Sequence, residues 1–288
     1  MNIKTIIVNM SNDFYSYKKE LADKAEKWFK KMETENLDII EKAFNNTKKY
    51  NPDYKFNDIN DNIFNNHIAQ NIQLLDTDSV TGAYLINYAT KNEDKPIALL
   101  NFASFKYPGG MFMKGSTAQE EALCHESILY NVLRKFNLTY YSDNRILCSR
   151  YKDIANMYIN RGLYTPNVLF IHNNEKFYCD VITVAAPNNR NFDTPKEINY
   201  KKLHSRIKFV LDIAEDNNIK TIILGAFGCG VFKQNPEEVA NIFKKLLIFG
   251  NYSFNNVYFV IPNNINNTNY SIFAKVLKDI ITGGIIIE

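Results

Sequence analysis

The sequence predicts an α/β protein in which helices cover both faces of a mostly parallel or mixed sheet. From about residue 70 onward, short β-rich runs alternate with longer segments of helical periodicity. Runs such as Ile97–Leu100 and Ile222–Leu224 are continuously apolar, as strands buried on both faces are. The 288 residues, 45% hydrophobic and 23% charged, have the composition of an ordinary globular protein with one large or two small domains.

The N-terminal part of the chain differs from the rest. From about Tyr15 to Lys49, apolar residues recur at helical spacing among charged helix formers, which predicts one or two amphipathic helices. The polar stretch Asn51–Asn66, dense in Asn and Asp, indicates a surface connection. We therefore expect an N-terminal helical extension over residues 1–66, packed on a main domain of residues 67–288, in a three-layer α/β/α arrangement.

The main domain is expected to contain six strands and five helices. The strands are predicted at Ile72–Leu75, Ile97–Phe102, Val168–His172, Tyr178–Ala185, Thr221–Leu224 and Asn256–Ile261. The helices are predicted at Ser79–Thr90, Ala118–Phe136, Lys196–Asp216, Pro236–Phe249 and Tyr270–Ile281. Ligands of such sheets bind at the carboxyl ends of the strands. We therefore expect the loops Ala103–Thr117, Ala186–Phe192 and Gly225–Gln234 to converge on one site.

Composition excludes several classes of function. A net charge of only +3 gives no strong field for nucleic acid, so we expect no sequence-specific binding of nucleic acid. No apolar run approaches the roughly 18 residues of a membrane span. The four cysteines form no CxxC pair and follow no secretory leader, which favours a reduced, intracellular (cytoplasmic) compartment. The four histidines lack metal-site spacing, so we expect neither a metal nor a cofactor.

The first of the three expected loops, Ala103–Thr117, joins an apolar strand to a helix that begins Gln119-Glu120-Glu121. Glycines at Gly109 and Gly110 would let the backbone approach a ligand closely, and N–H groups at a helix start favour an anion. Carboxylates beside a bound phosphate are costly unless they do chemistry. The pattern therefore indicates an enzyme that acts on a phosphate-bearing substrate by carboxylate acid/base catalysis.

The same residues also fit a structural explanation. Ser116 with Gln119, and Thr117 with Glu120, have the spacing of a capping box, and acids favour the first turn of a helix. Consecutive glutamates point about 100° apart on a helix. At most one can therefore cap the helix, and the other would face a cleft that raises its pKa.

The loop Gly225–Phe232 carries three glycines in six residues between a strand and a helix, a stronger signal for a phosphate cradle. Cys229 has no histidine near it in sequence, so a small buried residue is favoured over a nucleophile. Phe232 fits either the core or a surface against which a ribose packs.

Several of these segments together resemble the microbial-type poly(ADP-ribose) glycohydrolases, whose catalytic domain is a macrodomain. The signature is Gly109-Gly110-Met111, seven residues, then Gln119-Glu120-Glu121. The stretch Asn101–Ser104, the strand Asp180–Asn188 and the loop Gly225–Phe232 match the other blocks of the family in the same order. The resemblance extends from the N-terminal helices to about Ile261 and implies a macrodomain-like catalytic domain over residues 67–288.

The resemblance also implies an activity, hydrolysis of the ribose–ribose O-glycosidic bond of poly(ADP-ribose) to release ADP-ribose. By position, Glu121 would be the catalytic acid, Glu120 would hold the ribose hydroxyls, and Gln119 would support both. The implied ligand contacts are Asn101 and Ser104 at the distal ribose, Gly109, Gly110 and Met111 at the ligand backbone contact, Gly228, Cys229, Gly230 and Val231 around the diphosphate, and Phe232 against the ribose.

One position departs from the family pattern, because Met111 replaces the third glycine. A positive φ there would strain a methionine by about 1 kcal/mol. Met111 therefore makes a non-catalytic reader of ADP-ribose plausible. A hydrolase of mono-ADP-ribose on protein or nucleic acid is the other alternative that keeps the macrodomain, and an unrelated nucleotide-binding α/β protein also stays open. The expected partners are poly(ADP-ribose) or ADP-ribosylated protein, and we expect the chain to be a monomer.

Overall fold

The structure is a computed structural model that describes residues 3–56, 71–90, 96–151, 156–191, 194–264 and 268–282, with side chains from Tyr15 onward. Residues 57–66 of the expected surface connection, the expected domain boundary after residue 66, and Phe192 lie outside the described residues.

The described strands form one mixed seven-stranded sheet in the order β1-β4-β5-β3-β6-β7-β2. They are β1 (Lys48–Tyr50), β2 (Asn71–Leu75), β3 (Ile97–Phe102), β4 (Gly162–His172), β5 (Glu175–Val184), β6 (Thr221–Leu224) and β7 (Asn256–Val260). The five strands from β5 to β2 are parallel, whereas β4 is antiparallel to both β5 and β1. The expected mixed sheet is therefore confirmed, and its parallel part places the carboxyl ends of five strands at one edge.

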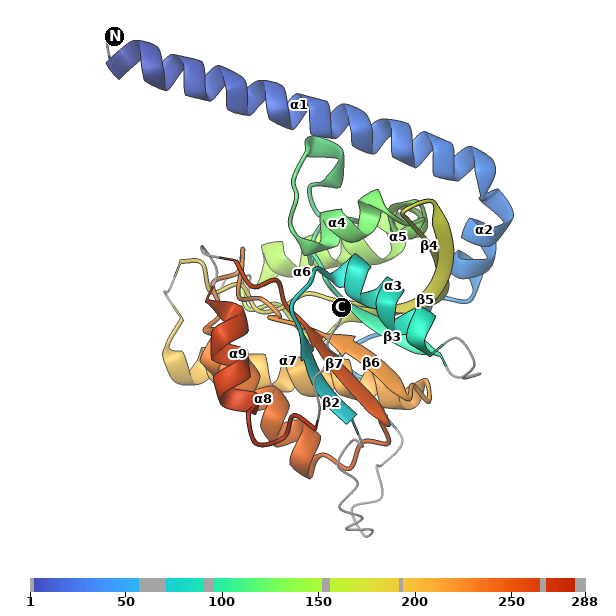
Figure 1. The fold of residues 1–288 in the computed structure, drawn as a ribbon, viewed down its shortest axis with the longest axis vertical. Coiled ribbons are helices and arrows are strands. Elements are labelled where there is room, and N and C mark those ends of the chain that lie inside the picture. The colour runs from blue at the N-terminus through green and yellow to red at the C-terminus, as the bar shows by residue number, and fades with distance from the viewer. Residues whose placement is uncertain are drawn as a thin grey trace.

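Helices cover both faces of this sheet (Figure 1). The helices are α1 (Ile3–Glu35), α2 (Leu37–Asn45), α3 (Ser79–Ala89), α4 (Gln119–His125), α5 (Leu129–Lys135), α6 (Ser142–Arg150), α7 (Lys196–Asp216), α8 (Pro236–Phe249) and α9 (Asn269–Leu277), with a 3₁₀ turn at Phe112–Lys114 and a π-helical turn at Asn137–Tyr141. Alternate residues of β3 point to opposite faces of the sheet and pack into two different hydrophobic cores. Ala98 and Leu100 belong to the core under α7, α8 and α9, whereas Ile97 and Leu99 belong to the core under α1 to α5. The three-layer α/β/α architecture is confirmed.

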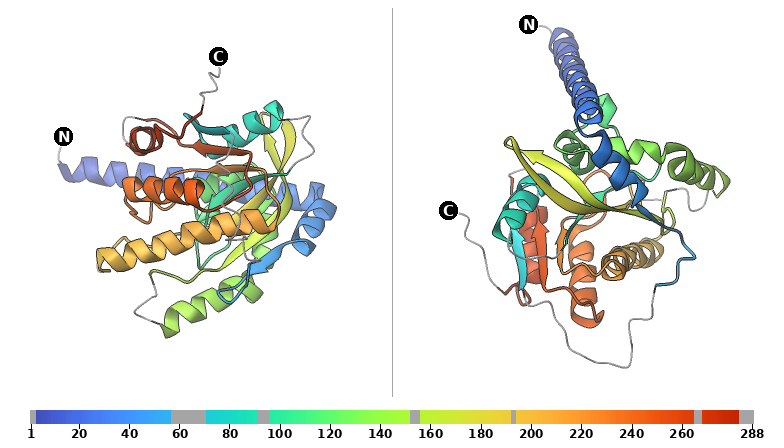
Figure 2. Two further views of the ribbon diagram at one scale, coloured as in Figure 1. Left: turned by 90° about the horizontal axis from the view of Figure 1, so that it is seen from below. Right: turned by 90° about the vertical axis from the view of Figure 1, so that its right-hand side faces the viewer.

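The N-terminal helices pack on the same layer as α4 and α5. Trp28 of α1 donates its indole N–H to the carbonyl of Ser127 over 2.9 Å. Gly115 has a left-handed φ of +72°, and a Cβ there would collide with the backbone of Lys18 in α1. The N-terminal end of α1 extends beyond the body of the molecule (Figure 2). The chain then adds β1 to the sheet, an edge strand that the sequence did not predict.

The single helix expected over Ala118–Phe136 is wrong, because the helix breaks between α4 and α5. Ser127 lies in the break and forms an antiparallel bridge with Phe170 of β4. Its hydroxyl donates to the carbonyl of Leu123 over 2.6 Å and accepts the N–H of Leu129 over 3.0 Å. A pairing with a distant strand thus interrupts a segment whose local pattern is helical throughout.

No helix among the described residues is long and apolar enough to cross a membrane.

Candidate active site

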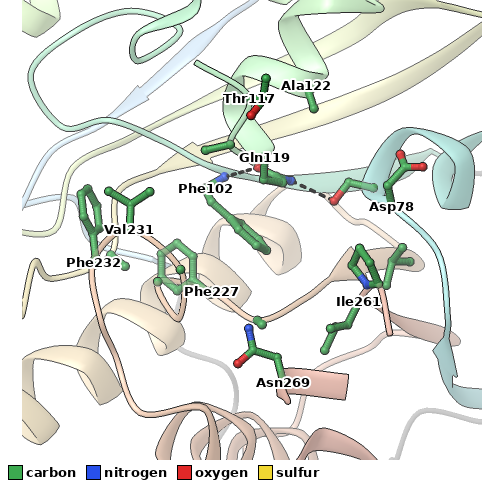
Figure 3. Close-up of a pocket in the computed structure, with 18 residues that line it drawn as sticks. Asp78, Phe102, Thr117, Gln119, Ala122, Phe227, Val231, Phe232, Ile261 and Asn269 are labelled. Atoms are coloured by element: carbon green, nitrogen blue, oxygen red, sulfur yellow. Dashed lines mark hydrogen bonds between the residues drawn. The ribbon is translucent and has the colours of Figure 1, made fainter. Parts of the chain in front are cut away.

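A cavity of about 360 Å³ opens at the carboxyl ends of β3, β6 and β7 (Figure 3). Its wall includes Thr117, Ala186 and the segment Ala226–Phe232 without Cys229, so the three loops expected to converge do meet. Its volume falls within the range of about 300–1,000 Å³ that is typical of ligand sites. The prediction that the three loops converge at this edge is therefore confirmed.

Part of this wall was not predicted from the sequence. Asp78 and Ser79 follow β2, Val260 ends β7, and Ile261, Pro262 and Asn269 follow it. Both strands are parallel to β3 and end at the same edge. The rule that selected the three loops would have selected these segments too, although neither carries a glycine motif.

Gln119 joins the first turn of α4 to the end of β3. Its Oε1 accepts the N–H of Phe102 over 2.8 Å, and its Nε2 donates to the carbonyl of Leu100 over 3.0 Å and to the Ser79 hydroxyl over 3.2 Å (Figure 3). The side chain thus acts like a short additional strand beside β3, and one side of it faces the cavity.

Glu120 is buried against the loop that follows β3. Its Oε2 accepts the N–H of Ser104 over 2.7 Å, and its Oε1 accepts Nδ2 of Asn101 over 3.3 Å. The pKa of Glu120 is raised to about 8, first by burial and then by the charge of Glu121, while the hydrogen bonds from Ser104, Asn101 and Gly109 act in the opposite direction. A group with this pKa carries a proton at pH 7.

Glu121 is also buried, with 5% of its surface exposed. Its Oε1 accepts the N–H of Met111 over 2.7 Å, whereas its buried Oε2 has no hydrogen-bond partner among the described residues. A Cβ at Gly110 would lie 2.5 Å from Oε1 of Glu121 and 3.0 Å from Oε2 of Glu120. The missing side chain of Gly110 therefore makes the room that both carboxylates occupy.

The capping-box interpretation is wrong for both glutamates. The N-cap of α4 is Ala118, and no side chain caps this helix end. The two carboxylates instead accept N–H groups of the preceding loop, at Ser104 and Met111. Neither glutamate is needed to complete the helix, so the structure leaves both available for another role.

Met111 is not strained. Its φ is −109°, while Gly109 and Gly110 before it have φ of +62° and +60°. The Met111 side chain is 44% exposed, and its N–H makes the hydrogen bond to Glu121. Any residue can therefore adopt this backbone conformation, and the substitution leaves the loop intact.

Asn101 is fully buried at the end of β3. Its Nδ2 donates to Glu120 and, over 3.3 Å, to the hydroxyl of Thr183, but its Oδ1 has no partner within the described part of the chain. The Ser104 hydroxyl accepts the N–H of Tyr107 over 3.2 Å and so shapes the loop. Two buried polar oxygens, on Asn101 and Glu121, thus have no partner among the described residues, and such atoms need an explanation such as a catalytic role or a bound water.

The second glycine loop faces the cavity more openly. Gly228 has a φ of +78° and packs against Ala186, whereas a Cβ at Gly230 would meet no atom within 4 Å. Gly228, Gly230, Val231 and Phe232 all line the cavity. Burial raises the pKa of the Cys229 thiol to about 12, so this cysteine is a poor nucleophile at neutral pH.

The structure thus brings the site residues into two adjoining groups. Gln119 and the second loop line the cavity, while Glu120, Glu121 and Asn101 lie in the buried layer beside it. No group of three or more His, Cys, Asp or Glu in the described ranges is arranged to hold a metal ion. The chemistry that the described side chains offer is that of a carboxylate pair next to a cavity.

Comparisons with known proteins agree with this arrangement. The family model described as microbial-type PARG, catalytic domain, matches residues 18–173, and the macro domain model matches residues 166–243. No curated protein matches the chain.

Solved structures of poly(ADP-ribose) glycohydrolases share the fold. The enzyme from Thermomonospora curvata, bound to the inhibitor ADP-HPD, is 24% identical with a TM-score of 0.74, over 90% of this chain and 98% of that one. The enzyme from Deinococcus radiodurans, in complex with ADP-ribose, is 25% identical with a TM-score of 0.67, over 84% of this chain and 97% of that one. Since the first family model covers more than half of the residues, the chain belongs to the family of microbial-type poly(ADP-ribose) glycohydrolase (PARG) catalytic domains and is a glycosidase of that class.

Proposed function

We propose that Glu121 is the acid/base group with which this chain hydrolyses the ribose–ribose O-glycosidic bond of poly(ADP-ribose). The observation that carries the proposal is the state of its carboxylate. One oxygen is fixed by the Met111 N–H, and the other is buried, without a partner among the described residues. A buried, oriented carboxylate beside a cavity is suited to transfer a proton to a bound substrate.

The proton that starts the reaction belongs to the Glu120–Glu121 pair. Because burial raises the pKa of Glu120 to about 8, the two coupled carboxyls together hold a proton at neutral pH. In the reactive form of the pair, the proton is on Glu121 and Glu120 is ionised. As the C–O bond to the departing ribose breaks, Glu121 donates this proton to the leaving oxygen and the remaining ribose becomes oxocarbenium-like. The Glu121 carboxylate then takes a proton from the attacking water, and ADP-ribose is released.

The remaining site residues position the ADP-ribose unit in this proposal. Asn101 and Ser104 contact the distal ribose, and Gly109, Gly110 and Met111 form the backbone wall behind it. The Gly228–Val231 loop surrounds the diphosphate, and Phe232 packs against a ribose. The open space at Gly230 and the unpaired Oδ1 of Asn101 support these assignments.

Two further features of the chain support its proposed setting. The contacts of α1 with the loop at Gly115 support an N-terminal extension packed on the catalytic domain. All four cysteines are free, which supports a reduced, intracellular compartment. Poly(ADP-ribose) and ADP-ribosylated proteins are the proposed partners.

The two alternatives that keep the macrodomain differ in what they require. A non-catalytic reader was suggested by Met111, and the φ of −109° removes the reason for it. A hydrolase of mono-ADP-ribose would use the same carboxylates, so products from chains and from singly modified targets must be compared. If ADP-ribose is released from chains but not from singly modified targets, the result favours the proposed activity.

The decisive experiment is Glu121→Gln, with Glu126→Gln at the C-terminal end of the same helix as the control. The amide keeps the shape of the side chain but cannot transfer the proton, so kcat should fall by about 10²–10⁴-fold. Calorimetric affinity for ADP-ribose should stay within about threefold, and Glu126→Gln should retain activity. If Glu121→Gln still cleaves chains at the normal rate, the acid is another residue.

A further inference from the structure

A second cavity, of about 250 Å³, lies beside the loop that follows β3. It is lined by Phe105, Leu147, Cys148, Tyr151, Tyr158 and Ile159, and none of these residues has a role in the proposed reaction. Apart from the tyrosine hydroxyls and the Cys148 thiol, its side chains are apolar. The volume is below the range of about 300–1,000 Å³ for complete small-molecule ligands, so it suits one ring system rather than a whole nucleotide.

The second cavity is connected to the first by a row of aromatic rings. Phe232 lines the first cavity, and its ring centroid lies 6.0 Å from that of Tyr158. Tyr158 in turn stacks on Phe105, with centroids 4.5 Å apart and planes 9° from parallel. Phe105 directly follows Ser104, whose N–H binds Glu120. The second cavity therefore begins one residue from the loop position that holds Glu120.

The second cavity is held in a fixed shape. Asn144 of α6 donates its Nδ2 to the carbonyl of Phe105 over 2.7 Å, and Arg145 donates to the carbonyl of Lys106 over 2.8 Å. Tyr158 has a left-handed φ of +54°, which side chains rarely adopt. At the rim, Tyr151 is 55% exposed.

Two cations act on groups that line the same cavity. Burial raises the pKa of the Cys148 thiol, and the nearby ammonium of Lys106 opposes that rise. Burial likewise raises the pKa of Tyr158, and the guanidinium of Arg190 acts against it. An aromatic pocket for a base, with cations at its border for phosphates, is complementary to a nucleotide.

From these observations we propose that the second cavity binds the adenine of the ADP-ribose unit that departs from the scissile bond. This inference rests on the proposed function, which requires a leaving group that itself carries an adenosine and a diphosphate. With the terminal unit in the first cavity, the next adenine stacks on the exposed ring of Tyr151 and packs against the stacked pair of Tyr158 and Phe105. Lys106 and Arg190 then face the second diphosphate, so the enzyme recognises two consecutive units.

Binding of ADP-ribose and of its dimer tests this proposal. In the Glu121→Gln background, which prevents turnover, calorimetry should show the dimer binding about tenfold tighter than ADP-ribose, the scale of one stacked base. Adding Tyr151→Ala should remove this difference and leave the affinity for ADP-ribose unchanged. Tyr178→Ala, which changes a similarly exposed ring on β5, should keep the difference.

Kinetics provide a second measurement. With Glu121 intact, Tyr151→Ala should raise KM for the dimer about tenfold and leave kcat within twofold. Equal affinity for dimer and monomer, or loss of both affinities in Tyr151→Ala, would overturn the second binding site. If neither ligand binds, the proposed function fails with it. If the dimer binds tighter than ADP-ribose but the protein with Glu121 intact does not cleave it, only the catalytic proposal fails.

Discussion

The two glycine loops of this protein look alike in sequence but differ in what their glycines face. In the first loop, a Cβ added at Gly110 would meet the carboxylates of Glu121 and Glu120, and a Cβ added at Gly109 would meet the ring of Tyr130. In the second loop, a Cβ at Gly230 would meet nothing within 4 Å, and six residues of the loop line the cavity. The first loop is packed against protein, and the second is open to a ligand.

The difference shows that a glycine-rich turn can serve two purposes. The first loop positions the carboxylate pair by donating its N–H groups from Ser104 and Met111. The second loop leaves free volume at the wall of the cavity. If the diphosphate follows the second loop, as proposed, it is kept apart from the carboxylates that the first loop holds, which limits repulsion between like charges.

The largest effect is expected from Gly110→Ala, which tests whether the first loop is packed around the carboxylates. The new Cβ would lie 2.5 Å from Oε1 of Glu121, and φ of +60° adds strain of about 1 kcal/mol. We expect kcat on poly(ADP-ribose) to fall at least about 100-fold, the scale of lost acid/base catalysis. A variant with nearly normal kcat would show that the carboxylates do not depend on this loop.

A smaller effect on affinity is expected from Gly230→Ala, which tests whether the second loop is open. The added methyl group meets no protein atom, so the free energy of unfolding should change by less than about 0.5 kcal/mol. If the diphosphate follows this backbone, Kd for ADP-ribose should rise about tenfold, the loss of roughly one charge-assisted hydrogen bond. Gly228→Ala is the contrast: its Cβ would lie 2.7 Å from that of Ala186, so it should destabilise the fold.

The buried carboxyl of Glu120, which the first loop holds, should affect the pH dependence of stability. The pKa of Glu120 is raised to about 8 in the folded chain from 4.5, so the native state binds more protons between these values. The contribution of protonated Glu120 to the free energy of unfolding is therefore fully present below about pH 4.5 and is lost as pH rises through 8.

Thermal unfolding of Glu120→Gln against the unchanged protein measures this contribution. The variant should gain in relative Tm as pH increases from 5 to 8 and show no further gain above about pH 9. A Tm difference that does not vary with pH would mean that Glu120 titrates normally.

The smallest effect is expected from Met111→Gly, which restores the third glycine of the family pattern. Because φ is already −109°, glycine relieves no strain and only adds freedom to the unfolded chain, about 0.4–1 kcal/mol of destabilisation. Activity should stay within about twofold. A large gain in kcat would show instead that the Met111 side chain obstructs the ligand.

Much of the fold could be predicted because its signals are local. Apolar strands such as Ile222–Leu224 and periodic helices such as Lys196–Asp216 carry their pattern within a few residues. The edge at which loops converge followed from strand direction alone. The break at Ser127 and the strand β1 could not be predicted, because both arise from pairing with β4, more than 40 residues further along the chain.

The sequence by itself determined the architecture and the choice of Gln119, Glu120 and Glu121 as the central residues, since hydrophobic periodicity and motif order are properties of the chain. Only the tertiary structure decided the partners of the carboxylates, the negative φ of Met111, and the aromatic row from Phe232 to Phe105. These features depend on burial and on contacts between segments distant in sequence. Spacing along the chain carries no information about either.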